Sequence, residues 1–146
     1  RGEYDGTILA LAGIQTLKLD HEINKIFSEE KIIPCAGQGV IAVQCRKNDF
    51  ENLKILKKIN DEDTKICAIT ERSLLKTIGG DCHTALGAYA KIDKNNIIII
   101  AQLFSDDGLK SFSIKKIGDK KLPEKLGISS GKELLKKSEG YYKKKR

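Results

Sequence analysis

One stretch, residues 64–80, most constrains the fold of this chain, because a helical pattern there stops abruptly. Apolar residues recur at helical spacing from Ile66 to Ile78, which predicts an amphipathic helix over residues 64–78. Gly79 and Gly80 follow, and glycine readily adopts the positive φ that ends a helix. Three strand patterns with turn sequences between them come next, at residues 85–92, 97–104 and 109–117. These elements predict a small α+β unit with a three-stranded antiparallel sheet.

A last helix is expected over residues 123–138, with a possible interruption near Gly127 and Gly131. Both this helix and the one before Gly79 are expected to cover one face of the sheet. The tail at residues 141–146 is basic, and such tails are usually disordered.

The first 59 residues carry weaker patterns. Residues 7–11 form a short apolar run that predicts a buried strand, with the start of a buried helix as the second choice. Asp20 is a candidate N-cap for a helix over residues 21–28. Residues 40–46 read as the clearest strand of this part, and residues 49–59 as a helix. The two glycines around Gln38 suit a turn, a hinge or a close backbone approach to a ligand.

Composition narrows the class of protein. The chain has 146 residues, of which 40% are hydrophobic and 5% aromatic, so one aliphatic core is feasible. Its net charge is +7, and no apolar run approaches the about 20 residues of a membrane span. Because the lysines are scattered except at the end of the chain, a solvated basic surface is favoured over a nucleic-acid interface.

The cysteine pattern argues against zinc and against disulfides. The sequence contains no CxxC pair, and its two histidines, His21 and His83, are isolated. The chain shows no secretion signal, so reduced thiols in the cytoplasm are expected, with the plastid stroma as the alternative. Cys82 lies at a loop tip, where it can be reached. The other cysteines lie in or beside apolar runs and are predicted to pack: Cys35, Cys45 and Cys67.

Three ordered motifs resemble porphobilinogen deaminase, also called hydroxymethylbilane synthase. The first is Gly2-Glu3-Tyr4-Asp5 leading to Leu9-Ala10-Leu11-Ala12-Gly13. The second is Ala36-Gly37-Gln38-Gly39 with Ala42-Val43-Gln44-Cys45-Arg46. The third joins Glu71-Arg72-Ser73-Leu74-Leu75 to Gly79-Gly80-Asp81-Cys82-His83 and Leu86-Gly87-Ala88-Tyr89-Ala90. The resemblance runs over nearly the whole chain.

The resemblance implies a domain organisation. Residues 1–36 would be the C-terminal part of a second, periplasmic-binding-protein-like domain, and residues 37–59 a return segment to the first domain. Residues 60–146 would be the third, cofactor-carrying domain. The chain is therefore expected to be the C-terminal half of an enzyme that is a monomer. A first domain with the catalytic aspartate would lie upstream of Arg1, so no catalytic residue is assigned here and residues 1–146 alone are expected to be inactive.

The resemblance also implies the chemistry. Such an enzyme condenses four porphobilinogen molecules into hydroxymethylbilane through polypyrrole intermediates, on a dipyrromethane cofactor that Cys82 would hold by a thioether. Leu9 and Ala10 match positions that approach the cofactor by their backbone, and Gln38 matches a cofactor-contacting position. Arg46 would bind or support a carboxylate, although an arginine at a strand end can simply lie on the surface.

The sequence departs from the family pattern at a few positions. Thr16 stands where the family usually has an arginine, so either a carboxylate contact is missing or another residue supplies it. His83 replaces a more familiar glutamine or arginine, and Thr84-Ala85 stand where a proline is frequent.

Two other kinds of function remain as alternatives. One is a nucleic-acid-binding module built on the lysine excess, although the chain lacks aromatic stacking platforms. The other is a small-ligand regulatory domain of α+β type without catalysis. Covalent attachment of a dipyrrole would separate both from the deaminase.

Overall fold

A three-stranded antiparallel sheet forms the centre of the structure. The computed structural model describes residues 2–80 and 84–140. The strands are β1 (Leu86–Asp93), β2 (Asn96–Phe104) and β3 (Ser111–Asp119), in the order β1-β2-β3. Ala101 of β2 pairs with Ala88 of β1 and with Ile114 of β3, which fixes the register. The predicted sheet is confirmed, with β3 beginning two residues later than the sequence pattern indicated.

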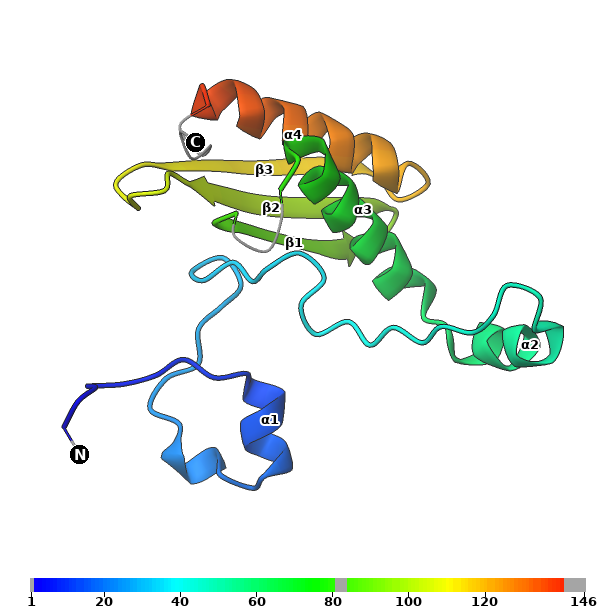
Figure 1. Ribbon diagram of the computed structural model, residues 1–146, viewed down its shortest axis with the longest axis horizontal. Helices are drawn as coiled ribbons and strands as arrows, with labels where there is room; N and C mark the ends of the chain where they lie inside the picture. Colours follow the sequence, from blue (N-terminus) through cyan, green and yellow to red (C-terminus); the bar gives the residue numbers. More distant parts are fainter. Residues whose placement is uncertain (1, 81–83, 141–146) are drawn as a thin grey trace.

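Two helices cover one face of this sheet (Figure 1). Helix α3 (Glu62–Ile78) begins at Asp61, whose carboxylate accepts a hydrogen bond of 2.7 Å from the backbone N–H of Thr64. It ends at Gly79, which has the left-handed φ of 70° that the two-glycine signal predicted. Helix α4 (Pro123–Ser138) begins with proline in its first turn, where the missing N–H costs nothing. The predicted α+β unit is therefore confirmed.

The hydrophobic core lies between the sheet and these helices. Alternate residues of β2 point into it, as the two-residue period of a strand requires. Five of its large side chains are completely buried: Leu74, Ile97, Ile99, Leu103 and Leu134.

The two helices approach each other closely at Gly127 and Gly131, and α4 continues through both residues. A Cβ atom at Gly127 would collide with the carbonyl oxygen of Thr70 and lie 2.7 Å from Cβ of Ser73. The interruption expected near these glycines is therefore wrong, because they are there to let the helix backbones approach.

Residues 2–60 contain little regular structure apart from three short helical segments. These are α1 (Leu11–Thr16), the 3₁₀ turn η1 (Asp20–Glu22) and α2 (Phe50–Ile59). The predicted helix over residues 49–59 is confirmed, and Asp49 caps it by accepting a 3.2 Å bond from the Asn52 N–H. Figure 1 shows α1 and α2 apart from the sheet.

Three predictions for this part are wrong. Residues 7–11 and 40–46 form no strand, and the helix expected over residues 21–28 is limited to η1. A strand needs a neighbour for its backbone N–H and C=O groups, and the described chain offers none to these segments. None of the described residues before Thr70 is fully buried, so packing does not hold these segments in regular structure either.

The division of the chain at residues 36 and 59 stays a prediction. The described helices include none that is long and apolar enough to cross a membrane.

Candidate functional site

The site begins where α3 ends and β1 starts. Gly79 donates a 3.1 Å hydrogen bond to the carbonyl of Lys76, and Gly80 a 3.2 Å bond to that of Leu75, so the helix closes tightly. The chain is described again at Thr84, whose Oγ1 lies 3.3 Å from where a Cβ of Gly80 would be. Cys82 and His83, the predicted attachment residue and its unusual neighbour, lie outside the described residues.

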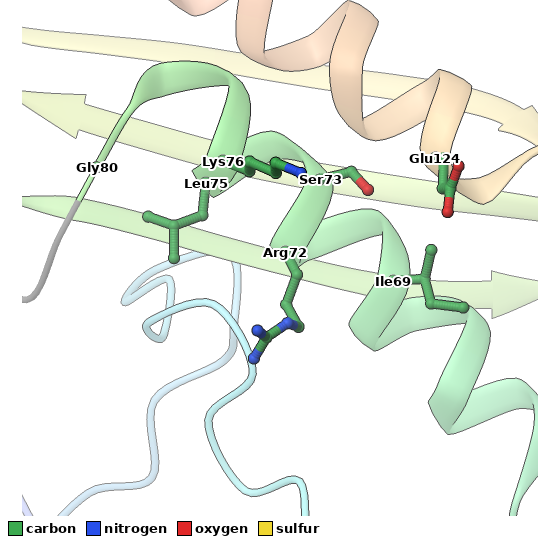
Figure 2. Close-up of a pocket in the computed structure, with 7 residues that line it drawn as sticks. All are labelled: Ile69, Arg72, Ser73, Leu75, Lys76, Gly80 and Glu124. Carbon is green, nitrogen blue, oxygen red and sulfur yellow. The ribbon is translucent and has the colours of Figure 1, made fainter. Parts of the chain in front are cut away.

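A pocket of about 490 Å³ lies beside this helix end. Arg72 and Lys76 come from successive turns of α3, and Figure 2 shows Arg72 extending away from Glu124 of α4. Among residues 2–80 and 84–140, neither cation forms an ion pair. The pocket is lined by Ile69, Arg72, Ser73, Leu75, Lys76, Gly80 and Glu124. Two cations against one carboxylate can attract an anion, and the sequence pattern predicted no role for either cation.

Glu71 is buried next to Arg72 and faces the other way, toward the sheet. Its Oε1 accepts a 2.7 Å hydrogen bond from the N–H of Ala90 in β1, and its Oε2 a 2.7 Å bond from the N–H of Gly37. Burial raises the pKa of Glu71, while the two backbone donors act in the opposite direction. We call these two hydrogen bonds the Glu71 bridge.

The segment before Gly37 lies along the outer edge of β1. The carbonyl of Pro34 accepts a 2.8 Å hydrogen bond from the N–H of Ala88. A Cβ atom at Gly87 would lie 2.6 Å from the carbonyl oxygen of Ile33, so only glycine allows this approach. Ala36 then packs against the core. A stretch that the sequence assigned to another domain is thus attached to the α+β unit.

Gln38 lies at the tip of a turn between two glycines with positive φ, Gly37 at 78° and Gly39 at 80°. Its backbone N–H donates to the carbonyl of Cys35 at 3.0 Å, and its side-chain Oε1 accepts from the N–H of Cys35 at 3.2 Å. Of the three interpretations of these glycines, the turn is confirmed, while the hinge and the close approach to a ligand stay predictions. Gln38 itself is exposed, so its amide group can reach a ligand.

Leu9 and Ala10 lie at the start of α1. Leu9 is 63% exposed and lines an apolar cleft of about 880 Å³ together with Leu11 and Phe27. The carbonyl of Ala10 is occupied by the first turn of α1, because it accepts from the N–H groups of Gly13 and Ile14. The backbone approach predicted for these residues therefore stays a prediction.

Arg46 and Thr16 lie on the surface of the described chain. Arg46 is exposed in the irregular segment before α2, not at the end of a strand. Thr16 donates its hydroxyl to the carbonyl of Ala12 at 2.8 Å, within α1. No hydrogen bond or ion pair between described residues joins Leu9, Ala10, Gln38 and Arg46 to one another. Their predicted role in cofactor binding stays a prediction.

The described cysteines differ in burial. Cys67 packs against the core, as predicted, and Cys45 is half-buried. Cys35 is exposed, so the packing role predicted for it is wrong. Its segment touches the sheet through Pro34 and Ala36, and the side chain between them faces solvent. Burial first, and the carboxylates of Glu71, Asp63 and Asp61 second, raise the pKa of Cys67 to about 11.

Alkylation of Cys67 is expected to be slow in the native protein. At about pH 8, a thiol with a pKa of about 11 has about a hundredfold less thiolate than one with a pKa of 9.0, and its higher nucleophilicity recovers about tenfold. Iodoacetamide should therefore label Cys67 about tenfold more slowly in native protein than in urea, measured by peptide mass spectrometry. Equal labelling rates in native protein and in urea would contradict this assignment.

The raised pKa of Cys67 also predicts how stability depends on pH. Because the pKa of this thiol is higher in the folded state than in the unfolded state, the native state should lose stability as the pH rises from 9.0 to about 11.

Comparison with known proteins gives the same family over both parts of the chain. The family model "Porphobilinogen deaminase, dipyromethane cofactor binding domain" matches residues 1–54, and "Porphobilinogen deaminase, C-terminal domain" matches residues 65–136. The porphobilinogen deaminases of Coxiella burnetii (strain Dugway 5J108-111) and Francisella tularensis subsp. novicida (strain U112) are 33% and 36% identical to the chain over 134 residues. Each match covers 92% of this chain and 44% of the relative, so the chain spans less than half the length of these relatives.

Proposed function

The chain belongs to the porphobilinogen deaminase family, and from this premise we propose that it is the cofactor-carrying part of a hydroxymethylbilane synthase. Its substrates would be porphobilinogen and the polypyrrole intermediates, and Cys82 would hold a dipyrromethane through a thioether. The observation that carries the proposal is the order of the two family matches, which follow each other along one chain at residues 1–54 and 65–136.

The described residues on either side of positions 81–83 fit such a group. Pyrroles with acetate and propionate side chains need cations nearby, and Arg72 and Lys76 lie on the pocket that reaches Gly80. Gly37 and Gly39 have open space where a side chain would otherwise extend, so a ligand can approach the turn that carries Gln38. We infer that the cations bind carboxylates and that Gln38 contacts the cofactor.

Cysteine chemistry suits the attachment. A thiolate is a soft nucleophile that forms a stable C–S bond with an electrophilic carbon, and the tether keeps the growing product at high effective concentration. When bound, the dipyrromethane would supply the anchored end onto which further pyrroles are joined. The protein's part would be to supply the thiol of Cys82, which lies between α3 and β1 in the sequence, and to bind the carboxylates.

Replacing Cys82 with serine tests this function. In protein expressed from its native gene, Cys82→Ser is expected to remove the covalent dipyrrole completely, because a hydroxyl is a far weaker nucleophile than a thiolate at neutral pH. Intact-mass spectrometry measures the attached mass, and an acid-aldehyde colour reaction confirms the pyrrole. Circular dichroism should show an unchanged fold, since position 82 falls between α3 and β1 and within neither of them.

Cys45→Ser and Cys67→Ser are the matched controls. Both should retain the added mass, while Cys67→Ser should lose some stability because that side chain packs against the core. A Cys82→Ser protein that still carries the dipyrrole, or a mass that maps to another cysteine, would show the assignment to be wrong.

A further inference from the structure

The outer edge of β1 is covered by a segment of the same chain that has little regular structure. The carbonyl of Pro34 accepts a 2.8 Å hydrogen bond from the N–H of Ala88. The carbonyl oxygen of Ile33 lies 2.6 Å from the place that a Cβ atom of Gly87 would take. Ile33 and Pro34 are half-buried, whereas all of residues 24–32 before them are exposed. We call residues 30–37 the β1 latch.

The two ends of the β1 latch are also held. At one end, the carboxylate of Glu30 pairs with Nζ of Lys115 in β3 at 3.0 Å. At the other end, Ala36 packs against the core, and the N–H of Gly37 donates a 2.7 Å hydrogen bond to Glu71. The sheet edge thus offers a cation, a backbone donor and an apolar contact in a fixed order, which is how an extended peptide is recognised.

The chain on either side of the β1 latch has few contacts of its own. In the described part of the chain, neither α1 nor α2 packs on the sheet (Figure 1). Residues 38–44 and 46–48 are exposed and serve as a tether. A tether keeps a weakly bound segment at high effective concentration, so the latch can stay bound through few contacts. Segments with few buried contacts are also those that open locally.

We propose that the outer edge of β1 is a peptide-docking groove, and that the β1 latch is its ligand, bound reversibly and supplied by the same chain. The latch therefore holds together the two parts of the chain that different family models match, residues 1–54 and 65–136, independently of the peptide bonds between them. This interaction goes beyond the proposed function and does not depend on it.

Cleavage of the native chain at Arg46 tests the proposal. The sequence has four arginines, of which two are the end residues of the chain and Arg72 lies within α3. Arg46 is exposed in an irregular segment, so an arginine-specific protease should cut there first. Fragments 1–46 and 47–146 are expected to co-elute in gel filtration. An excess of a synthetic peptide of residues 28–38, under reducing conditions, should release fragment 1–46, and a scrambled peptide should not.

Gly87→Ala should detach the β1 latch, because the added methyl group meets the backbone of Ile33. The cleaved variant should separate into its fragments without added peptide. In the uncut variant, the amide of Ala88 should exchange at least about tenfold faster, while the amides of β2 keep their protection. Gly118→Ala is the matched control, since its added methyl group in β3 meets flexible side-chain atoms of Leu126. It should leave exchange at Ala88 unchanged.

Ala36→Asp is a second variant that alters only the β1 latch and leaves the sequence of the α+β unit intact. It places a carboxylate against the core, so the cleaved fragments should again separate. The proposal would be overturned by wild-type fragments that separate on cleavage, by variant fragments that stay together, or by a peptide of residues 28–38 that releases nothing. Wild-type protein without any dipyrrole would instead overturn the proposed function, and these results would still decide whether the groove exists.

Discussion

Replacing Leu74 with alanine is expected to destabilise the protein strongly, by about 2–5 kcal/mol in the free energy of unfolding. Leu74 is completely buried in α3, at the centre of the core between the helices and the sheet. The surrounding helices and strands can close only part of the cavity that the lost carbons leave. Urea denaturation followed by circular dichroism measures the change. The total free energy of unfolding of a small domain is about 5–15 kcal/mol, so this substitution would remove a large part of the stability.

Ile41→Ala is the control for this prediction. Ile41 is an equally large aliphatic residue, but it is 92% exposed in the irregular segment before α2. Its truncation should change the free energy of unfolding by no more than about 0.5 kcal/mol. Similar losses at both positions would show that stability is not concentrated in α3, α4 and the sheet.

Gly127→Ala is the second large effect that we expect. Alanine normally favours a helix over glycine by about 0.8–1.0 kcal/mol, so an open helical glycine should gain from this change. At Gly127 the added methyl group meets the backbone of α3 at Thr70 and Leu74, which cannot move aside as a flexible side chain would. Overpacking of this kind costs about 1–3 kcal/mol and occasionally more, which outweighs the gain in helix propensity. The net result should be a lower midpoint of thermal unfolding.

The same substitution at Gly13 provides the comparison. Gly13 is also helical, in α1, and nothing lies within 4 Å of the added Cβ. Gly13→Ala should therefore leave the thermal midpoint unchanged or raise it slightly. A Gly127→Ala protein as stable as Gly13→Ala would mean that the two helices are farther apart than the structure shows.

The sequence predicted the part of the fold in which local signals and packing agree. Three signals indicate the same helix α3: its apolar stripe, the cap at Asp61 and the stop at Gly79. The structure confirms this helix, because its apolar stripe is buried against the sheet. Residues 7–11 and 40–46 have the composition of strands, but pairing depends on a neighbour that local sequence does not contain. These are the segments where the prediction failed.

The candidate site was predictable only where a motif marked it. The glycines around Gln38 indicated a tight turn, which the structure confirms. The role of Glu71 was not predicted, since its partners lie 34 and 19 residues away and are backbone groups without a side-chain signature. Its place in the Glu71-Arg72 motif was the only signal in the sequence. Cys35 shows the converse error, because an apolar neighbourhood in sequence did not mean burial in space.

The segment before Gly37, which lies along the outer edge of β1, affects how the protein behaves in concentrated solution. An open strand edge is a template on which another molecule can add a strand and begin an aggregate. Here the carbonyl of Pro34 and the carboxylate of Glu71 already occupy the outward N–H groups of Ala88 and Ala90. On the opposite edge strand, β3, Lys115 and Lys116 pair with Glu30 and Glu133, so their charges are partly neutralised. Growth of sheets between molecules is therefore opposed at the β1 edge, by hydrogen-bond occupancy.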